Sequence, residues 1–107
     1  MENLNSSVSP ELKAELVLLN KKGEKNLVID INQTKYCDSS GLSAILLANR
    51  LCRDSEGTFV LTGVNEQIQK LIEISQLDRV LHITPTLSEA VDFVYMEEIE
   101  RNLGEVE

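Results

Sequence analysis

The order of elements in this chain follows from two runs, Leu27-Val28-Ile29-Asp30-Ile31 and, after a polar segment, Asp38-Ser39-Ser40-Gly41-Leu42. The first run is short, apolar and β-branched, a pattern that predicts a buried strand. The second run predicts a helix that begins at Ser39 or Ser40, because short polar residues cap helices and apolar residues follow at helical spacing to about residue 54. Together they predict a strand that passes through a polar connection into a helix.

A further helix is predicted before the first strand. Ser9-Pro10-Glu11 supplies a capping hydroxyl, a proline for the first turn and an early carboxylate, and Lys21-Lys22-Gly23 supplies cations and a glycine for the end. The leucines between these signals recur at helical spacing. We therefore expect a helix over about 9–22, with Ser9 as its cap.

The alternation continues downstream. Strands are predicted at 58–62 and, more weakly, at 79–83, and helices from the cap Asn65 and from Thr86 or Ser88 to about residue 101. Alternating strands and helices predict an α/β fold, a mostly parallel sheet with four helices. Only three strands are predicted, so one apolar edge of the sheet is expected to be open.

Length and composition predict a single domain. The 107 residues form one unit, 1–107, with a polar lead-in at 1–8 and a frayed acidic end at 104–107. Apolar residues make up 42% of the chain and aromatic residues only 4%, so the core is expected to be aliphatic. This composition favours a parallel sheet covered by helices over a ligand pocket walled with rings.

Charge and cysteine content exclude several classes of function. The formal charge of −8 repels nucleic acids and anionic membranes, and no apolar run approaches membrane length, so a cytoplasmic protein is expected. Cys37 and Cys52 do not have the spacing of metal ligands, and His82 is the only histidine. We expect two reduced, buried thiols, no metal and no cofactor.

Ser40 is the candidate site, an exposed serine where a strand passes into a helix. The N–H groups of a first helical turn lack intrahelical partners and the helix dipole there favours negative charge, so a phosphate on Ser40 would be tolerated. Gly41 has no side chain and would let another protein approach closely. Asp38 and the serines could instead act only as caps. A nucleophilic serine would need a base, and His82, within an apolar strand, is expected to be structural, so no catalytic residue is expected.

These runs resemble a known family. The segments Val28-Ile29-Asp30-Ile31 and Tyr36-Cys37-Asp38-Ser39-Ser40-Gly41-Leu42-Ser43-Ala44 are similar to the STAS domain of bacterial anti-sigma factor antagonists. The resemblance extends through Phe59-Val60-Leu61-Thr62-Gly63-Val64 and Ile74-Ser75-Gln76-Leu77-Asp78 to Leu87-Ser88-Glu89-Ala90-Val91, and upstream to Leu4-Asn5-Ser6-Ser7. It covers almost the whole chain.

The resemblance implies a regulator of transcription that has no catalytic activity of its own. Ser40 would be phosphorylated by a kinase anti-sigma factor, and a serine phosphatase would reset it. The unphosphorylated protein would bind the anti-sigma factor and release the sigma factor. Asp38 would orient the loop, and Ser39, Gly41 and Leu42 would form the partner-binding surface with Asn5, which stands where the family often has an acidic residue.

The resemblance leaves two questions open: what covers the open edge of the sheet, and which function the domain serves. The family has one or two strands before the segment matching 4–7, and this chain is expected to lack them. The open edge would then be covered by upstream sequence, a partner or a second copy, and we expect a homodimer through it. The alternative function is an unphosphorylated docking subunit of a lipid-transport ATPase, in which Ser40 would only cap the helix.

Overall fold

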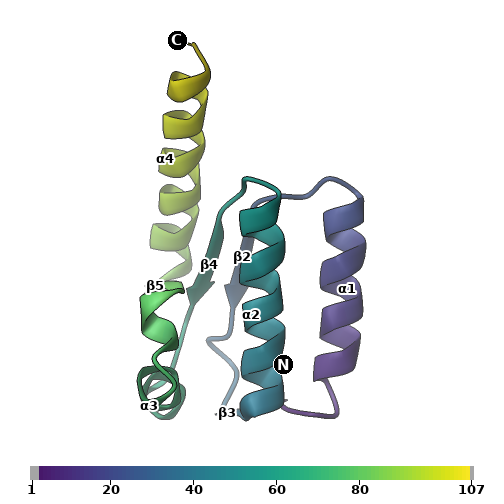
Figure 1. Cartoon of the computed structure of the whole chain (residues 1–107). Coiled ribbons are helices and arrows are strands. Elements are labelled where there is room, and N and C mark those ends of the chain that lie inside the picture. Colours follow the sequence, from purple (N-terminus) through teal and green to yellow (C-terminus); the bar gives the residue numbers. More distant parts are fainter. Residues whose placement is uncertain (1–2, 107) are drawn as a thin grey trace.

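The computed structural model describes residues 3–106 (Figure 1). Short strands and helices alternate along the chain: β1 (Asn3–Leu4), α1 (Ser9–Lys21), β2 (Leu27–Asp30), β3 (Tyr36–Cys37), α2 (Ser39–Asp54), β4 (Phe59–Thr62), α3 (Glu66–Ile74), a 3₁₀ turn (Leu77–Arg79), β5 (His82–Thr84) and α4 (Leu87–Val106). The expected order of four helices and three main strands is confirmed.

The strands form two parallel sheets. The larger sheet has the order β2-β4-β5, in which Leu27 lies opposite Phe59 and Leu61 opposite Ile83. The smaller pairs β1 with β3, with Leu4 opposite Cys37. This second pair was not predicted, since two-residue strands carry no periodicity to recognise.

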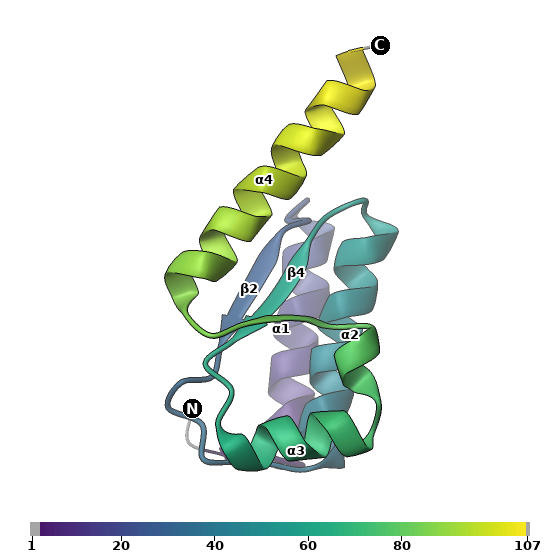
Figure 2. The ribbon, with the colours of Figure 1, turned by 90° about the vertical axis from the view of Figure 1, so that its left-hand side faces the viewer.

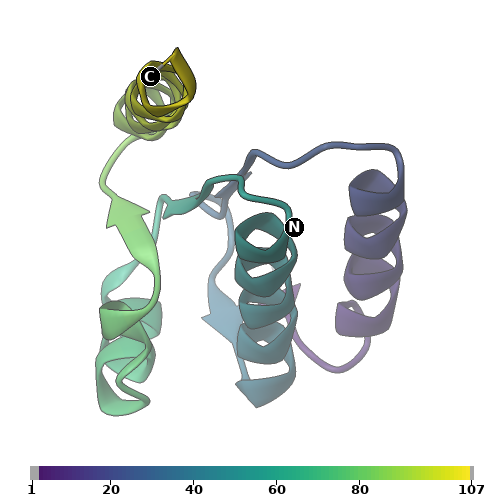
Figure 3. The same ribbon diagram turned by 45° about the horizontal axis from the view of Figure 1, so that its top comes forward.

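Three layers result from the alternation of side chains along β4. Phe59 and Leu61 belong to the core cluster that includes Ile45 of α2 and Leu16 of α1. The intervening Val60 and Thr62 therefore point to the other face, where α4 packs against β4. Figures 1 and 3 show α1 and α2 on one side of the larger sheet and α4 on the other, while α3 lies across the bottom of the molecule in Figure 2.

The core is aliphatic, as the composition predicts. The largest fully buried side chains are those of Leu4, Ile31, Ile45, Val60, Leu61, Thr62, Ile68 and Ile72. Both cysteines are buried and form no disulfide. On the outer edge of β2, the part of the chain that the structure describes places no strand.

Three local predictions were wrong. Ser9 does not cap α1: the cap position is Val8, without a side-chain hydrogen bond, and Ser9 is the first helical residue. The strand expected at 79–83 is a 3₁₀ turn followed by β5, because Gln76 has a left-handed φ of 60° and starts the turn. The last helix does not fade near Arg101 but continues to Val106.

Candidate functional site

The site lies at the first turn of α2, at the lower end of the molecule in Figure 1. Asp38 is the N-cap in an extended conformation, and its Oδ1 accepts a hydrogen bond from the N–H of Gly41 at 3.1 Å. Its backbone N–H donates to the carbonyl of Leu4 at 3.1 Å. Asp38 thus fixes both the start of the helix and its contact with β1.

Ser39 and Ser40 are the first two helical residues. Ser39 is exposed, whereas Ser40 is half-buried, so the expectation of an exposed Ser40 was wrong. The cause is the approach of α1: the buried hydroxyl of Ser9 donates a hydrogen bond to the backbone oxygen of Ser40 at 2.8 Å. In this turn Asp38 accepts hydrogen bonds from the N–H groups of Gly41 and Leu42, and the helix dipole favours negative charge.

Gly41 lies beneath the surface. A Cβ at this position would stand 2.3 Å from the carbonyl oxygen of Leu4 and 2.8 Å from Sγ of Cys37. Its missing side chain therefore makes room for β1, not for a partner outside the domain. Leu42 is also buried, at 5% exposure, and packs in the core. Both residues support the site from within.

Asn5 shapes the entry into α1. Its side-chain oxygen accepts a hydrogen bond from the N–H of Ser7 at 3.0 Å, and its carbonyl accepts from Val8 and Ser9. Because the preceding Leu4 pairs with Cys37, Asn5 lies next to the strand that leads to Asp38. The structure thus brings Asn5, Asp38 and Ser40 to one end of the molecule.

Cys37 sits immediately under the site as a neutral thiol. Burial, and then the nearby charge of Asp38, raise its pKa to about 11. Its Sγ lies 3.5 Å from the carbonyl oxygen of Asp38. A thiol with so high a pKa is a poor nucleophile at neutral pH, so Cys37 acts here as a small packing residue.

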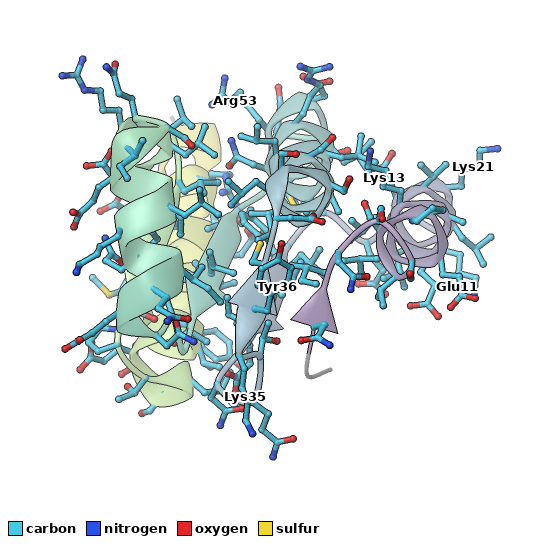
Figure 4. The ribbon with its side chains drawn as sticks, turned by 90° about the horizontal axis from the view of Figure 1, so that it is seen from below. Glu11, Lys13, Lys21, Lys35, Tyr36 and Arg53 are labelled. Carbon is cyan, nitrogen blue, oxygen red and sulfur yellow. The ribbon has the colours of Figure 1, made fainter. Side chains whose placement is uncertain are left out.

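Sequence reasoning missed the rest of the exposed surface. Tyr36 on β3 is 53% exposed, and Figure 4 shows it near the centre of the lower face, with Lys13 and Glu11 on α1 to one side. One turn along α2 a shallow groove of about 240 Å³ begins, lined by Lys13, Ser43, Leu46, Leu47 and Arg50. The sequence carries a pattern that could have predicted this surface, because positions 39, 43, 46 and 50 have the spacing of one helix face.

The sequence profile described as "Mlab, STAS domain" matches residues 2–85. The chain belongs to the STAS domain family. The run from Asp38 to Leu42 at the start of α2 lies inside the matched region.

Relatives of this STAS domain include proteins named as anti-sigma factor antagonists. BtrV of Bordetella bronchiseptica is 33% identical over 72 residues, 67% of this chain and 62% of that protein. The Thermotoga maritima protein is 30% identical over 73 residues, 68% of this chain and 65% of that protein. The match spans less than two thirds of the length of both relatives.

Solved structures show the same fold. The crystal structure of the T. maritima anti-sigma factor antagonist TM1081 superposes with a TM-score of 0.84 at 25% identity, over 88% of this chain and 81% of that one. The unphosphorylated form of the anti-sigma factor antagonist SpoIIAA superposes with a TM-score of 0.70 at 18% identity, over 89% of this chain and 84% of that one.

Within residues 3–106, no three His, Cys, Asp or Glu side chains are grouped so that they could hold a metal ion. None of the helices in the same range combines the length and the hydropathy that a membrane span requires. His82 is exposed and stacks on Phe93, with ring centroids 3.6 Å apart, so it packs against α4.

Proposed function

We propose that this STAS domain is a cytoplasmic anti-sigma factor antagonist, controlled by phosphorylation of Ser40. It would bind a kinase anti-sigma factor and so release a sigma factor for transcription. The observation that carries the proposal is Ser40 in the first turn of α2, within a chain whose relatives are named as anti-sigma factor antagonists. The protein would act by binding, without catalysis or a cofactor of its own.

A phosphate at this position suits the local electrostatics of the helix. It would carry nearly two negative charges, which the positive end of the helix dipole favours. The carboxylate of Asp38 caps the same turn and would repel the phosphate. We infer that phosphorylation changes the charge of the surface while the hydrogen bond from Ser9 holds the backbone in place.

The partner-binding surface would start at Ser39 and Ser40 and continue along α2. Ser39 and Ser43 are exposed, and the groove beyond them places apolar Leu46 and Leu47 between the cations Lys13 and Arg50. Asp38 and Asn5 would orient this surface, and Gly41 and Leu42 would support it from beneath. Leu46 and Leu47 are half-buried, and a partly exposed apolar centre with charged residues at its rim is typical of a protein interface.

Phosphorylation is tested by incubating the full chain with its candidate kinase anti-sigma factor and ATP. One phosphate should be added, at Ser40 by peptide mass spectrometry, and Ser40→Ala should abolish it. Ser39→Ala and Ser43→Ala are the matched controls and should still be phosphorylated. Transfer to Ser40→Ala at the wild-type rate would show that the site is another residue.

Binding is tested with the same partner. Ser40→Asp should weaken binding at least about tenfold, because it places a charge where the partner sits, whereas Ser40→Ala should bind close to wild type. A serine phosphatase should restore binding of the phosphorylated chain. If no phosphate is found in cells and the chain co-purifies with an ATPase, the alternative of a docking subunit in a lipid-transport complex is favoured.

We also propose that the open edge of β2 supports self-association. Within residues 3–106 this edge carries no strand, although the resemblance places one or two strands before Leu4. Unpaired backbone groups on a half-buried strand invite pairing. Sedimentation of the full chain should show a dimer, weakened by a proline at Val28. A monomer at all accessible concentrations would contradict this proposal.

A further inference from the structure

The outer face of α4 carries an apolar ridge that nothing covers within residues 3–106. Leu87, Val91, Tyr95, Ile99 and Leu103 follow one another at intervals of four residues, and Met96 lies beside them. All six are exposed, from 38% for Val91 to 66% for Tyr95. Residues four apart are neighbours on a helix surface, so these side chains form one continuous strip. Figure 2 shows α4 as the outermost layer on its side of the sheet.

The rotation of α4 is fixed by contacts on its opposite face. Ala90 is buried, and Phe93 stacks on His82 of β5. Further along, the Glu98 carboxylate accepts a hydrogen bond from Asn26 at 3.3 Å. The ridge therefore cannot turn inward without breaking these contacts.

Three further contacts secure the distal half of the helix. Lys25 pairs with Glu98 at 3.4 Å, and Arg101 contacts both Glu98 and the hydroxyl of Thr58. Thr58 precedes β4 and Lys25 precedes β2, so α4 is attached at the ends of both strands. The domain therefore covers the inner face of α4, which carries Ala90 and Phe93, and leaves the apolar ridge on the outer face uncovered.

The size of the ridge suits a protein contact. The exposed fractions of its six residues correspond to roughly 600 Å² of surface, the upper end of the largest apolar patch on a typical monomer. A partner laid on a patch of that size would bury roughly 1,200 Å² in total, the lower end of specific interfaces.

The charges beside the ridge indicate the charge of a partner that would fit it. Exposed Glu89, Asp92 and Glu100 flank it, and the one cation of α4, Arg101, is engaged on the inner face. An apolar strip with an acidic border is complementary to an amphipathic helix with an apolar stripe and a basic border.

The same charges disfavour two other occupants. Two copies of α4 packed through this ridge would carry the same exposed acidic border, Glu89, Asp92 and Glu100, so surfaces of like charge would meet at the contact. An anionic membrane would be repelled by the carboxylates in the same way. We propose that the outer face of α4 binds a basic amphipathic helix of a partner protein, centred on Tyr95.

This surface is separate from the Ser40 site. It lies on the opposite side of the larger sheet from α1 and α2 (Figures 1 and 3), so both surfaces could be occupied at once. Packing along ridges of residues four apart favours helices that cross at about 50°, which would concentrate the contact on Val91, Tyr95 and Ile99.

The test uses the full chain and two labelled peptides of about 18 residues, each with a leucine stripe at helical spacing. One peptide carries lysines beside the stripe and the other glutamates. The lysine peptide should bind at least about tenfold more tightly than the glutamate peptide by fluorescence anisotropy. The double variant Tyr95→Ser/Ile99→Ser should weaken its binding at least about tenfold.

Two controls separate this surface from general attraction between charges. Leu18→Ser changes an apolar residue of α1 that is 53% exposed and should leave binding unchanged. Asp92→Asn/Glu100→Gln should weaken binding several-fold at low salt and less at high salt. Circular dichroism should show every variant folded, since the changed side chains lie outside the core.

Three results would overturn the proposal. The first is lysine-peptide binding that is equal for wild type and Tyr95→Ser/Ile99→Ser, which would mean charge alone. The second is no binding of the lysine peptide up to about 1 mM. The third is a dimer by sedimentation that the same double variant abolishes, which would make a second copy the occupant.

Discussion

The buried hydroxyl of Ser9 donates a hydrogen bond to the backbone carbonyl of Ser40 over 2.8 Å. It joins the first turn of α1 to the first turn of α2 across 31 positions of sequence. Ser40 is thereby placed by tertiary contact as well as by its helix, and the residue is half-buried.

Ser9→Ala should lower the free energy of unfolding by about 1–2 kcal/mol, because it removes a buried hydrogen bond. Urea unfolding measures the loss, and Ser7→Ala, at an exposed position, is the control and should change stability little. If Ser9 positions the site, phosphorylation of Ser40 should also slow in Ser9→Ala under conditions where the variant is fully folded. Equal stability of the two variants would contradict a structural role for the bond.

Gly41→Ala should destabilise the domain by about 2–3 kcal/mol, at the upper end for overpacked cores. The new Cβ would stand 2.3 Å from the Leu4 carbonyl oxygen, and a backbone atom cannot move aside as a side chain can. Ser43→Ala, exposed on the same helix, should be close to neutral. Thermal unfolding of both variants gives the comparison, and a Gly41→Ala protein as stable as wild type would mean that β1 does not pack as described.

The sequence predicts the helix caps of this site better than it predicts which residues are buried. Asp38, Ser39 and Ser40 were placed at a helix start because capping depends on local residues, and Asn65 was identified as a cap for the same reason: its side chain accepts from Ile68 at 2.8 Å. Burial is not local. That Ser9 faces Ser40, and that Gly41 lies under β1, depends on segments brought together by the fold.

The last helix shows the same limit at larger scale. The helix was predicted, but the residues that face the sheet and those that face outward could not be separated without knowing which face packs on β4. Arg101, where the helix was expected to fade, contacts Thr58 and Glu98, and sequence periodicity cannot predict such contacts. Propensity alone is a weak prior where tertiary contacts decide.

Glu98→Gln should reduce stability at neutral pH and leave it nearly unchanged in acid. The hydrogen bond from Asn26 and the charges of Lys25 and Arg101 hold the pKa of Glu98 below its usual value, although partial burial opposes them. A lowered folded-state pKa gives a contribution that is present above the unfolded pKa and lost as pH falls through the folded pKa.

Urea unfolding of wild type and Glu98→Gln at pH 7 and at pH 3 measures this difference. The gap between the two proteins should narrow at the lower pH, while the matched variant Glu100→Gln, exposed on α4, should show little gap at either pH. A gap for Glu98→Gln that stays constant with pH would show that the carboxylate charge contributes nothing to the attachment of α4.

Cys52 should make the domain less stable in alkali. Burial raises the pKa of its thiol from 9.0 to about 11, so the folded state keeps its proton where the unfolded state loses it. The contribution of the thiol to the free energy of unfolding should be fully present below about pH 9 and should fall as pH rises toward 11. The total fall should be about 3 kcal/mol for a shift of this size, and the contribution should level off above pH 11.

Cys52→Ala leaves a small cavity and should cost about 1 kcal/mol at pH 7, but it should flatten the fall in stability between pH 9 and 11 relative to wild type. Alkaline effects that both proteins share cancel in the difference between their unfolding free energies, so this difference isolates the Cys52 thiol. An identical alkaline fall in the two proteins would mean that Cys52 is not held as a buried, neutral thiol.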